Sequence, residues 1–138
     1  MITSLHIENY VLISNLDIQF RPGFSVITGE TGAGKSIILG ALGLILGQRA
    51  DSKTIKNGAS KCIIEGSFRI GDYNLQEFFT QNDLDYDNEC LIRREISGNG
   101  KSRSFINDTP VGLQQLKELG EKLIDIHSQH QNLLLSND

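Results

Sequence analysis

Hydrophobic and polar residues alternate with a period of two at the start of the chain. Residues 5–11 and 16–20 follow this pattern, which is typical of strands with one buried face. Arg21-Pro22-Gly23 then predicts a turn into a third apolar run at residues 24–28. Two strands are therefore expected before a third strand that leads into the next segment.

The pattern changes at residues 37–46, which are apolar nearly all round. This distribution predicts a helix buried against a sheet, and Gly47 is expected to end it. Residues 48–60 are polar and are expected to form a loop.

The rest of the chain alternates between short predicted elements. In chain order they are a strand at 61–70, a short helix at 73–81, an acidic turn at 82–88, a strand at 89–97, a tight turn at 98–100, a strand at 102–107 that closes a hairpin, a second turn at 107–110, a helix at 111–119 ended by Gly120, and a final strand at 123–127. The sequence therefore predicts an α/β fold that is rich in antiparallel hairpins.

The junction between the third strand and the apolar helix carries the main chemical motif. Residues 29–36 read Gly-Glu-Thr-Gly-Ala-Gly-Lys-Ser, which matches the phosphate-binding P-loop pattern. Glycines allow backbone N–H groups to wrap a polyphosphate at contact distance. Lys35 is expected to reach the β- and γ-phosphates and Ser36 to bind Mg²⁺, at the positive end of the helix dipole. A glycine-rich turn without a ligand is the structural alternative.

The type of nucleotide and ATPase follows from what surrounds the motif. No Asn-Lys-x-Asp segment is present to recognise guanine, which favours ATP. Small kinases and GTPases often place the loop after their first strand, whereas an antiparallel β preface suits an ABC-type ATPase head, by analogy of fold. Asp125 is a candidate metal carboxylate, although a solvated Asp on a strand explains it better.

Composition limits the partners and the setting. The chain has 138 residues and a formal charge of −4, so no overall positive field draws it to DNA. Cys62 and Cys90 lie in apolar runs and are expected to be buried free thiols. The longest apolar stretch is too short to cross a bilayer, and no signal peptide is apparent. We expect a soluble cytoplasmic protein.

Three further groups are candidates for chemistry. Gln129 lies between His127 and His130, a spacing that gives only weak support for a metal site. Gln129 itself could place its carbonyl oxygen on Mg²⁺ or on a metal-bound water, or could be a solvated loop residue. Arg49 could reach a phosphate or be a solvent-exposed side chain. A basic cluster that could contact nucleic acid, or be a solvated β-face, comprises Arg93, Arg94, Lys101 and Arg103.

Four segments together resemble the RecN family of bacterial DNA-repair proteins, relatives of the SMC proteins with an ABC-type ATPase head. They are Asn9-Tyr10-Val11-Leu12-Ile13, residues 28–37 with the Glu-Thr-Gly-Ala-Gly form of the loop, Leu46-Gly47-Gln48-Arg49-Ala50, and Ile124-Asp125-Ile126-His127-Ser128-Gln129-His130. Ser128, Asn107-Asp108 and Lys56 depart from the usual pattern of the family, but none of them is a phosphate-cradling position.

The resemblance implies a specific architecture. Residues 1–138 are expected to form the N-terminal lobe of a P-loop, ABC-type ATPase head with a mixed or antiparallel β preface, while the coiled coil and the C-terminal lobe lie outside this chain. A second copy of the head would close around ATP and Mg²⁺ in the recombinational repair of DNA double-strand breaks. DNA contacts would lie outside these residues, no membrane contact is expected, and the setting would be cytoplasmic and nucleoid-associated.

The resemblance also assigns site residues. It makes Gln129 a catalytic and metal-binding candidate beside Lys35 and Ser36, and it makes Arg49 a nucleotide contact. The full set of expected nucleotide contacts is Gly29, Glu30, Thr31, Gly32, Ala33, Gly34, Lys35, Ser36, Ile37 and Arg49. The lobe alone is expected to be inactive, because the signature motif and the Asp-Glu strand are not in this sequence. Two other functions stay open: a DNA-tethering module in which nucleotide only switches head association, and a small-molecule P-loop kinase.

Overall fold

Six strands form one antiparallel sheet in the described part of the chain, in the order β2-β1-β3-β4-β5-β6. The structure is a computed structural model, which describes residues 2–20, 32–50, 52–71 and 74–134. The strands are β1 (Ile2–Tyr10), β2 (Ile13–Gln19), β3 (Lys61–Arg69), β4 (Glu89–Ser97), β5 (Ser102–Ile106) and β6 (Thr109–Val111). The helices are α1 (Gly32–Ile45), the short 3₁₀ helix η1 (Ser52–Thr54), α2 (Gln76–Gln81) and α3 (Leu113–Leu134).

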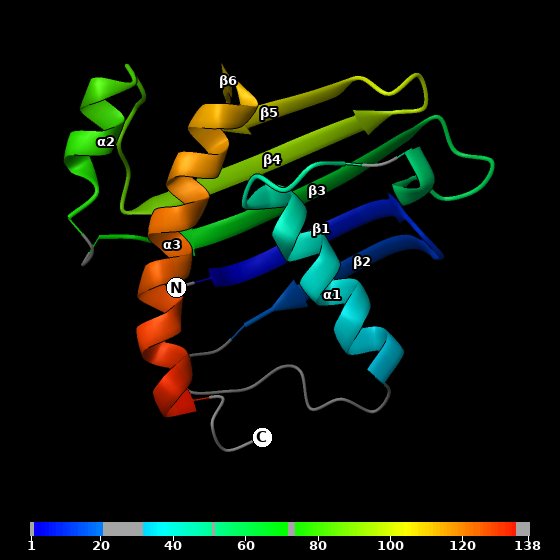
Figure 1. Cartoon of the computed structure of the whole chain (residues 1–138), viewed down its shortest axis with the longest axis horizontal. Coiled ribbons are helices and arrows are strands. Elements are labelled where there is room, and N and C mark those ends of the chain that lie inside the picture. The colour runs from blue at the N-terminus through cyan, green and yellow to red at the C-terminus, as the bar shows by residue number, and fades with distance from the viewer. Residues whose placement is uncertain (1, 21–31, 51, 72–73, 135–138) are drawn as a thin grey trace.

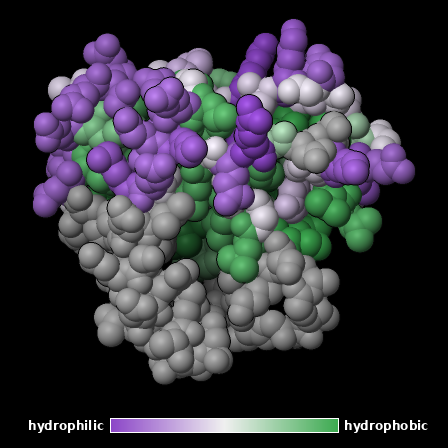
Figure 2. All heavy atoms as spheres, viewed as in Figure 1, coloured by the Kyte–Doolittle hydropathy of each residue, from purple (hydrophilic) through white to green (hydrophobic). Residues whose placement is uncertain are grey.

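Helices α1 and α3 cover the same face of this sheet (Figure 1). The strands alternate between buried residues under the helices and half-buried residues on the opposite face, as the period of two requires. The core comprises buried residues of the sheet and of both helices, among them Leu5, Ile7, Ile64, Phe68, Ile92, Ile106, Ala41, Ile45, Leu116, Leu119 and Leu123. Figure 2 shows hydrophilic residues gathered over α2 and the first turns of α3, and hydrophobic residues in the region of α1.

Most of the predicted strands are confirmed. Residues 5–11, 16–20, 61–70, 89–97 and 102–107 fall on β1, β2, β3, β4 and β5 with small changes at their ends. The apolar helix is α1, and Gly47 follows it with φ of +104°, the left-handed conformation of a helix C-cap. The predicted strand at residues 24–28 lies outside the described residues.

Two predicted boundaries are shifted. The helix predicted at 73–81 is shorter and spans only Gln76–Gln81, where Phe78 and Phe79 are buried. The second turn is confined to Asn107 and Asp108, whose φ angles of 49° and 66° suit a two-residue hairpin turn. Thr109 and Pro110, which were predicted in that turn, belong instead to the edge strand β6. Proline is tolerated there because its nitrogen, which has no hydrogen, need not donate to a neighbouring strand.

The predicted final strand at 123–127 is wrong, because these residues continue helix α3. Leu116, Leu119 and Leu123 are buried at helical spacing on one face of a helix that runs to Leu134. Gly120 therefore does not end the helix. A Cβ built at Gly120 would lie 2.0 Å from the carbonyl oxygen of Leu46, so this glycine lets α3 approach the end of α1 closely.

This close approach gives a stability prediction. In a helix interior, alanine is more stable than glycine by about 1 kcal/mol. At Gly120, however, the Cβ of alanine would overlap the backbone carbonyl of Leu46, which has little room to move. We expect Gly120→Ala to lower the free energy of unfolding by about 1–3 kcal/mol, as measured by urea denaturation followed by circular dichroism.

A matched control is Gly98→Ala in the turn after β4. A Cβ at Gly98 would meet only the Ser60 carbonyl oxygen, at an ordinary contact distance of 3.6 Å. A change of less than about 0.5 kcal/mol is expected there. Equal effects of the two substitutions would contradict the close contact between α1 and α3.

Candidate nucleotide-binding site

Helix α1 begins inside the glycine-rich motif. The backbone of Gly32–Ser36 is helical, and the first turn carries no acidic residue. The N-terminal N–H groups and the positive end of the helix dipole are therefore not neutralised by the helix's own side chains, which fits the binding of an anion. The predictions for Gly29, Glu30 and Thr31 lie outside the described residues.

Within residues 32–36 the structure describes the backbone alone, so the roles predicted for Lys35 and Ser36 stay predictions. Ala33 and Gly34 lie in the same first turn of α1. Ile37 is half-buried and packs against the hydrophobic core. Its side chain therefore helps to hold α1 against the core, and its nucleotide contact stays a prediction.

Two glycines allow α1 to lie close to the sheet. A Cβ at Gly40 would lie 2.4 Å from the Tyr10 hydroxyl, and a Cβ at Gly66 of β3 would lie 2.6 Å from Cδ1 of Ile45. Tyr10 and Ile45 are both buried. The helix that opens at the motif thus lies close to β1 at Gly40 and to β3 at Ile45.

The C-terminal end of α1 is closed by a regular hydrogen-bonded cap. The backbone N–H of Gln48 donates to the Gly43 carbonyl at 3.0 Å, and that of Gly47 donates to the Leu44 carbonyl at 3.3 Å. This is the bonding of a Schellman motif with glycine in the left-handed position.

A buried arginine completes this cap, a role that the sequence pattern did not predict. Arg94 of β4 is 1% exposed, and its Nη1 donates to the carbonyl oxygens of Leu44, at 2.8 Å, and of Gln48. Burial lowers the pKa of Arg94. The alternation of β4 could have revealed it, since Arg94 lies between the buried Ile92 and Ile96 on the core face of the strand.

Arg93 points to the face of the sheet opposite to that of Arg94, so the four basic residues do not share one surface. Its guanidinium lies 3.3 Å from Glu95, 3.5 Å from Asp108 and 3.7 Å from Glu65 in ion pairs, and 4.4 Å from the centre of the Phe105 ring. Consecutive strand residues face opposite sides, and three carboxylates surround Arg93. The pair Arg93-Arg94 therefore does not form a positive surface.

Arg49 is exposed and follows the C-terminal end of α1. The motif lies at the other end of this 14-residue helix, a separation of about 20 Å at 1.5 Å per residue. The structure therefore does not bring Arg49 to phosphates held at the start of the same helix.

Gln129 lies in the second half of α3, together with Asp125, His127 and His130, and the structure describes their backbone alone. The C-terminal end of α3 and the N-terminal end of α1 lie at the same end of the molecule (Figure 1). The fold therefore places Gln129 and the motif at the same end, although they are far apart in the sequence.

Comparison with known proteins identifies the family of this chain. Residues 4–137 match the model of the AAA domain. The chain belongs to this family. Membership of this family of ATPases implies that the AAA domain binds a nucleotide.

Curated relatives are similar to this AAA domain over its whole length. It is 44% identical to the DNA repair protein RecN of Haemophilus influenzae, with 100% of this chain and 26% of that protein aligned. It is 39% identical to RecN of Bacillus subtilis, with 100% of this chain and 24% of that protein aligned. The chain thus spans about a quarter of the length of these relatives.

Solved structures show the fold of the AAA domain. The Smc head domain of Pyrococcus furiosus superposes with a TM-score of 0.71 at 22% identity, covering 88% of this chain and 32% of that one. The recombination mediator protein RecF in complex with ATP gives a TM-score of 0.61 at 19% identity, covering 80% of this chain and 27% of that one. The AAA domain therefore has the P-loop fold of SMC-type and RecF-type ATPase heads.

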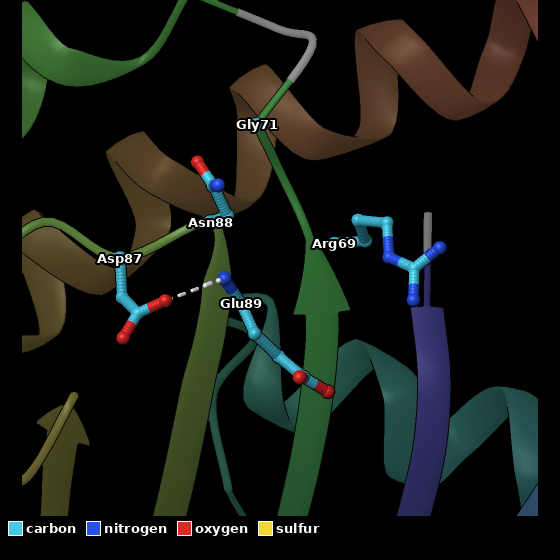
Figure 3. A pocket seen from close by; sticks show the side chains of 5 residues that line it. All are labelled: Arg69, Gly71, Asp87, Asn88 and Glu89. Atoms are coloured by element: carbon cyan, nitrogen blue, oxygen red, sulfur yellow. Dashed lines mark hydrogen bonds between the residues drawn. The ribbon is translucent and has the colours of Figure 1, made fainter.

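A separate pocket lies at the ends of β3 and β4 (Figure 3). It has a volume of about 350 Å³ and is lined by Arg69, Gly71, Asp87, Asn88 and Glu89. The Asp87 carboxylate accepts a hydrogen bond from the Glu89 backbone N–H at 3.1 Å. Two carboxylates beside one arginine do not suit a polyphosphate, and none of the lining residues belongs to α1.

Cys62 and Cys90 are buried free thiols, as predicted, and burial raises their pKa to about 11 and about 12 respectively. Among the described residues, no group of three or more His, Cys, Asp or Glu side chains could hold a metal ion. No helix in that part of the chain has the length and apolar character needed to span a membrane.

The exposed face of the AAA domain carries a histidine between carboxylates. His6 Nε2 lies 2.9 Å from Glu8, and Nδ1 lies 2.5 Å from Asp17 of β2, while Glu65 of β3 is its register partner. The hydrogen bond to Glu8 is the largest influence and raises the pKa of His6; partial burial opposes this rise, and Asp17 adds to it. Both ring nitrogens can donate to carboxylates only in the protonated ring.

A pH dependence of stability follows. Because the pKa of His6 in the folded state is above the unfolded value of 6.5, its contribution is fully present below pH 6.5 and is lost as the pH rises through the folded pKa. At pH 5.5 we expect the wild-type protein to be more stable than His6→Gln, by less than about 1 kcal/mol in the free energy of unfolding. The difference is small because water screens the ion pairs of His6 with Glu8 and Asp17. Denaturant titrations from pH 5.5 to 8.5 should show this difference shrink; a constant difference would contradict the assignment.

Proposed function

We propose that this chain is the N-terminal, ATP-binding lobe of an ABC-type ATPase head that acts in the recombinational repair of DNA double-strand breaks. The observation that carries the proposal is that α1 opens within the glycine-rich motif, with no acidic residue in its first turn, and is buried on an antiparallel sheet. Relatives similar over the whole chain are named DNA repair protein RecN, which supports the process.

The motif supplies the phosphate contacts in this proposal. Backbone N–H groups of residues 29–36 would surround the β- and γ-phosphates of ATP, and Lys35 would neutralise part of their charge. Ser36 would hold Mg²⁺ through its hydroxyl, with Gln129 as a further ligand that also orients the attacking water. Bound Mg²⁺ would neutralise the charge that develops on the phosphates during hydrolysis.

The proposal includes a second copy of the head and DNA as partners. A solved structure that superposes on this chain with a TM-score of 0.70 comes from work on the ATP-driven dimerization and DNA-stimulated activation of SMC ATPases. This similarity supports both a second head and DNA as partners. The net charge of −4 favours DNA contacts through parts of the protein beyond these residues. We place the protein in the cytoplasm, at the nucleoid, and expect negligible hydrolysis by the lobe alone.

Turnover is the test that separates this proposal from its alternative. The full-length protein should hydrolyse ATP, with a rate per molecule that rises with protein concentration as heads pair. A protein that binds ATP and DNA but never hydrolyses ATP would instead be a nucleotide-switched module that tethers DNA. Phosphoryl transfer to a small acceptor molecule would contradict both readings.

A further inference from the structure

The guanidinium of Arg94 joins the sheet to the C-terminal end of α1. Its Nη1 donates to the carbonyls of Leu44 and Gln48, and its Nε donates to the Ser102 hydroxyl of β5 at 3.0 Å. The last turn of α1 contains no basic residue. Arg94 therefore supplies, from another element, the positive charge that favours a helix C-terminus.

Helix α3 meets α1 at the same place. The Cβ position of Gly120 lies 2.0 Å from the Leu46 carbonyl oxygen, and that of Gly47 lies 2.5 Å from Cα of Lys117. Two backbones thus approach where no side chain fits between them. We call this contact the helix junction; it consists of residues 44–48, Arg94, Lys117 and Gly120.

The helix junction lies far from the nucleotide site but on both helices that lead to it. Helix α1 runs from the junction back to Gly32, and α3 runs on from Gly120 to Gln129, about 13 Å further at 1.5 Å per residue. The two functional ends lie at the same end of the molecule (Figure 1). Because α1 and α3 are fixed to each other at this junction, the angle between them there sets the distance between their far ends.

We infer that Arg94 is a positioning residue for ATP hydrolysis, an inference that rests on the proposed function. Arg94 holds the end of α1 against the sheet, and Gly120 allows α3 to pack closely on α1. Together these two contacts set the distance between the phosphate-binding motif and Gln129. In the proposed function, the contacts to the phosphates come from α1 and its loop. Displacement at the helix junction should therefore slow turnover and leave ATP affinity nearly unchanged.

The test compares Arg94→Met and Arg94→Lys in the full-length protein. Methionine fills much of the space without donating, whereas lysine keeps a buried cation that can donate to the carbonyls. We expect kcat to fall by about tenfold to a hundredfold in Arg94→Met, and by less in Arg94→Lys, with the Kd for ATP within about threefold of wild type. Circular dichroism at the assay temperature establishes that each variant is folded.

The matched control is Arg93→Met, the neighbouring arginine on the outer face of β4, whose kcat should match wild type. Gly120→Ala disturbs the helix junction from the side of α3, so its effect on kcat should not add to that of Arg94→Lys. Should Arg94→Met fail to fold, Arg94→Lys decides, because lysine lacks the Nε donor that binds the Ser102 hydroxyl and should still lower kcat. If kcat of Arg94→Lys equals that of wild type, or if only the affinity for ATP is lost, the proposed role of Arg94 is wrong. A wild-type protein without turnover would overturn the proposed function and this inference together.

Discussion

Lys35→Ala in the full-length protein is expected to weaken ATP binding by at least about a hundredfold, because the variant loses charge-assisted hydrogen bonds to the phosphates. Lys35 is the lysine of the motif and lies in the first turn of α1, where the helix dipole also favours the anion. Isothermal titration with ATP and Mg²⁺ measures the change.

Lys101→Ala is the matched control for this substitution. Lys101 is exposed in the turn between β4 and β5, away from α1, and its loss removes the same charge from the protein. ATP affinity should not change in this variant. If Lys35→Ala binds ATP as tightly as Lys101→Ala, the motif does not hold the phosphates.

Gln129→Ala should reduce ATP hydrolysis by about a hundredfold, since an oriented polar group is lost from the reacting water and the metal. ATP binding should be retained, because the proposed phosphate contacts are made by residues 29–36 at the start of α1. Steady-state hydrolysis measured beside equilibrium binding separates the two effects.

Gln114→Ala provides the control on the same helix. Gln114 is an exposed glutamine in the first turn of α3, at the end remote from Gln129. Its removal should leave hydrolysis unchanged. Equal rates for Gln129→Ala and wild type would remove Gln129 from the site.

The strands could be predicted because one face of this sheet is buried and the other is not. Each strand therefore alternates, and a period of two is visible in residues 5–11 and 16–20 without any knowledge of the fold. The motif could be recognised for a different reason, since the geometry of phosphate binding requires glycines at fixed spacing.

Helix α3 could not be predicted correctly from local pattern. Residues 123–127 alternate over too short a stretch to distinguish a strand from a helix, and Gly120 has the appearance of a helix end. Its actual role is the close contact with Leu46, which depends on an element more than seventy residues away in the sequence. Contacts of this kind appear only when the two helices are placed together.

Arg94 shows the same limit for the candidate site. In the sequence it forms a basic pair with Arg93, yet the strand sends the two side chains to opposite faces, one into the core and one among carboxylates. The partners of Arg94 are backbone carbonyls of α1, and no residue type in the sequence identifies them. Buried polar groups take the hydrogen bonds that the fold provides.

The most direct test of the central claim is a structure of the full-length protein with Mg²⁺ and a non-hydrolysable ATP analogue. The claim predicts the triphosphate at the N-terminal end of α1, within contact of residues 29–36, with Ser36 on the metal. A triphosphate bound at another position, such as the pocket of Arg69 and Asp87, would contradict it.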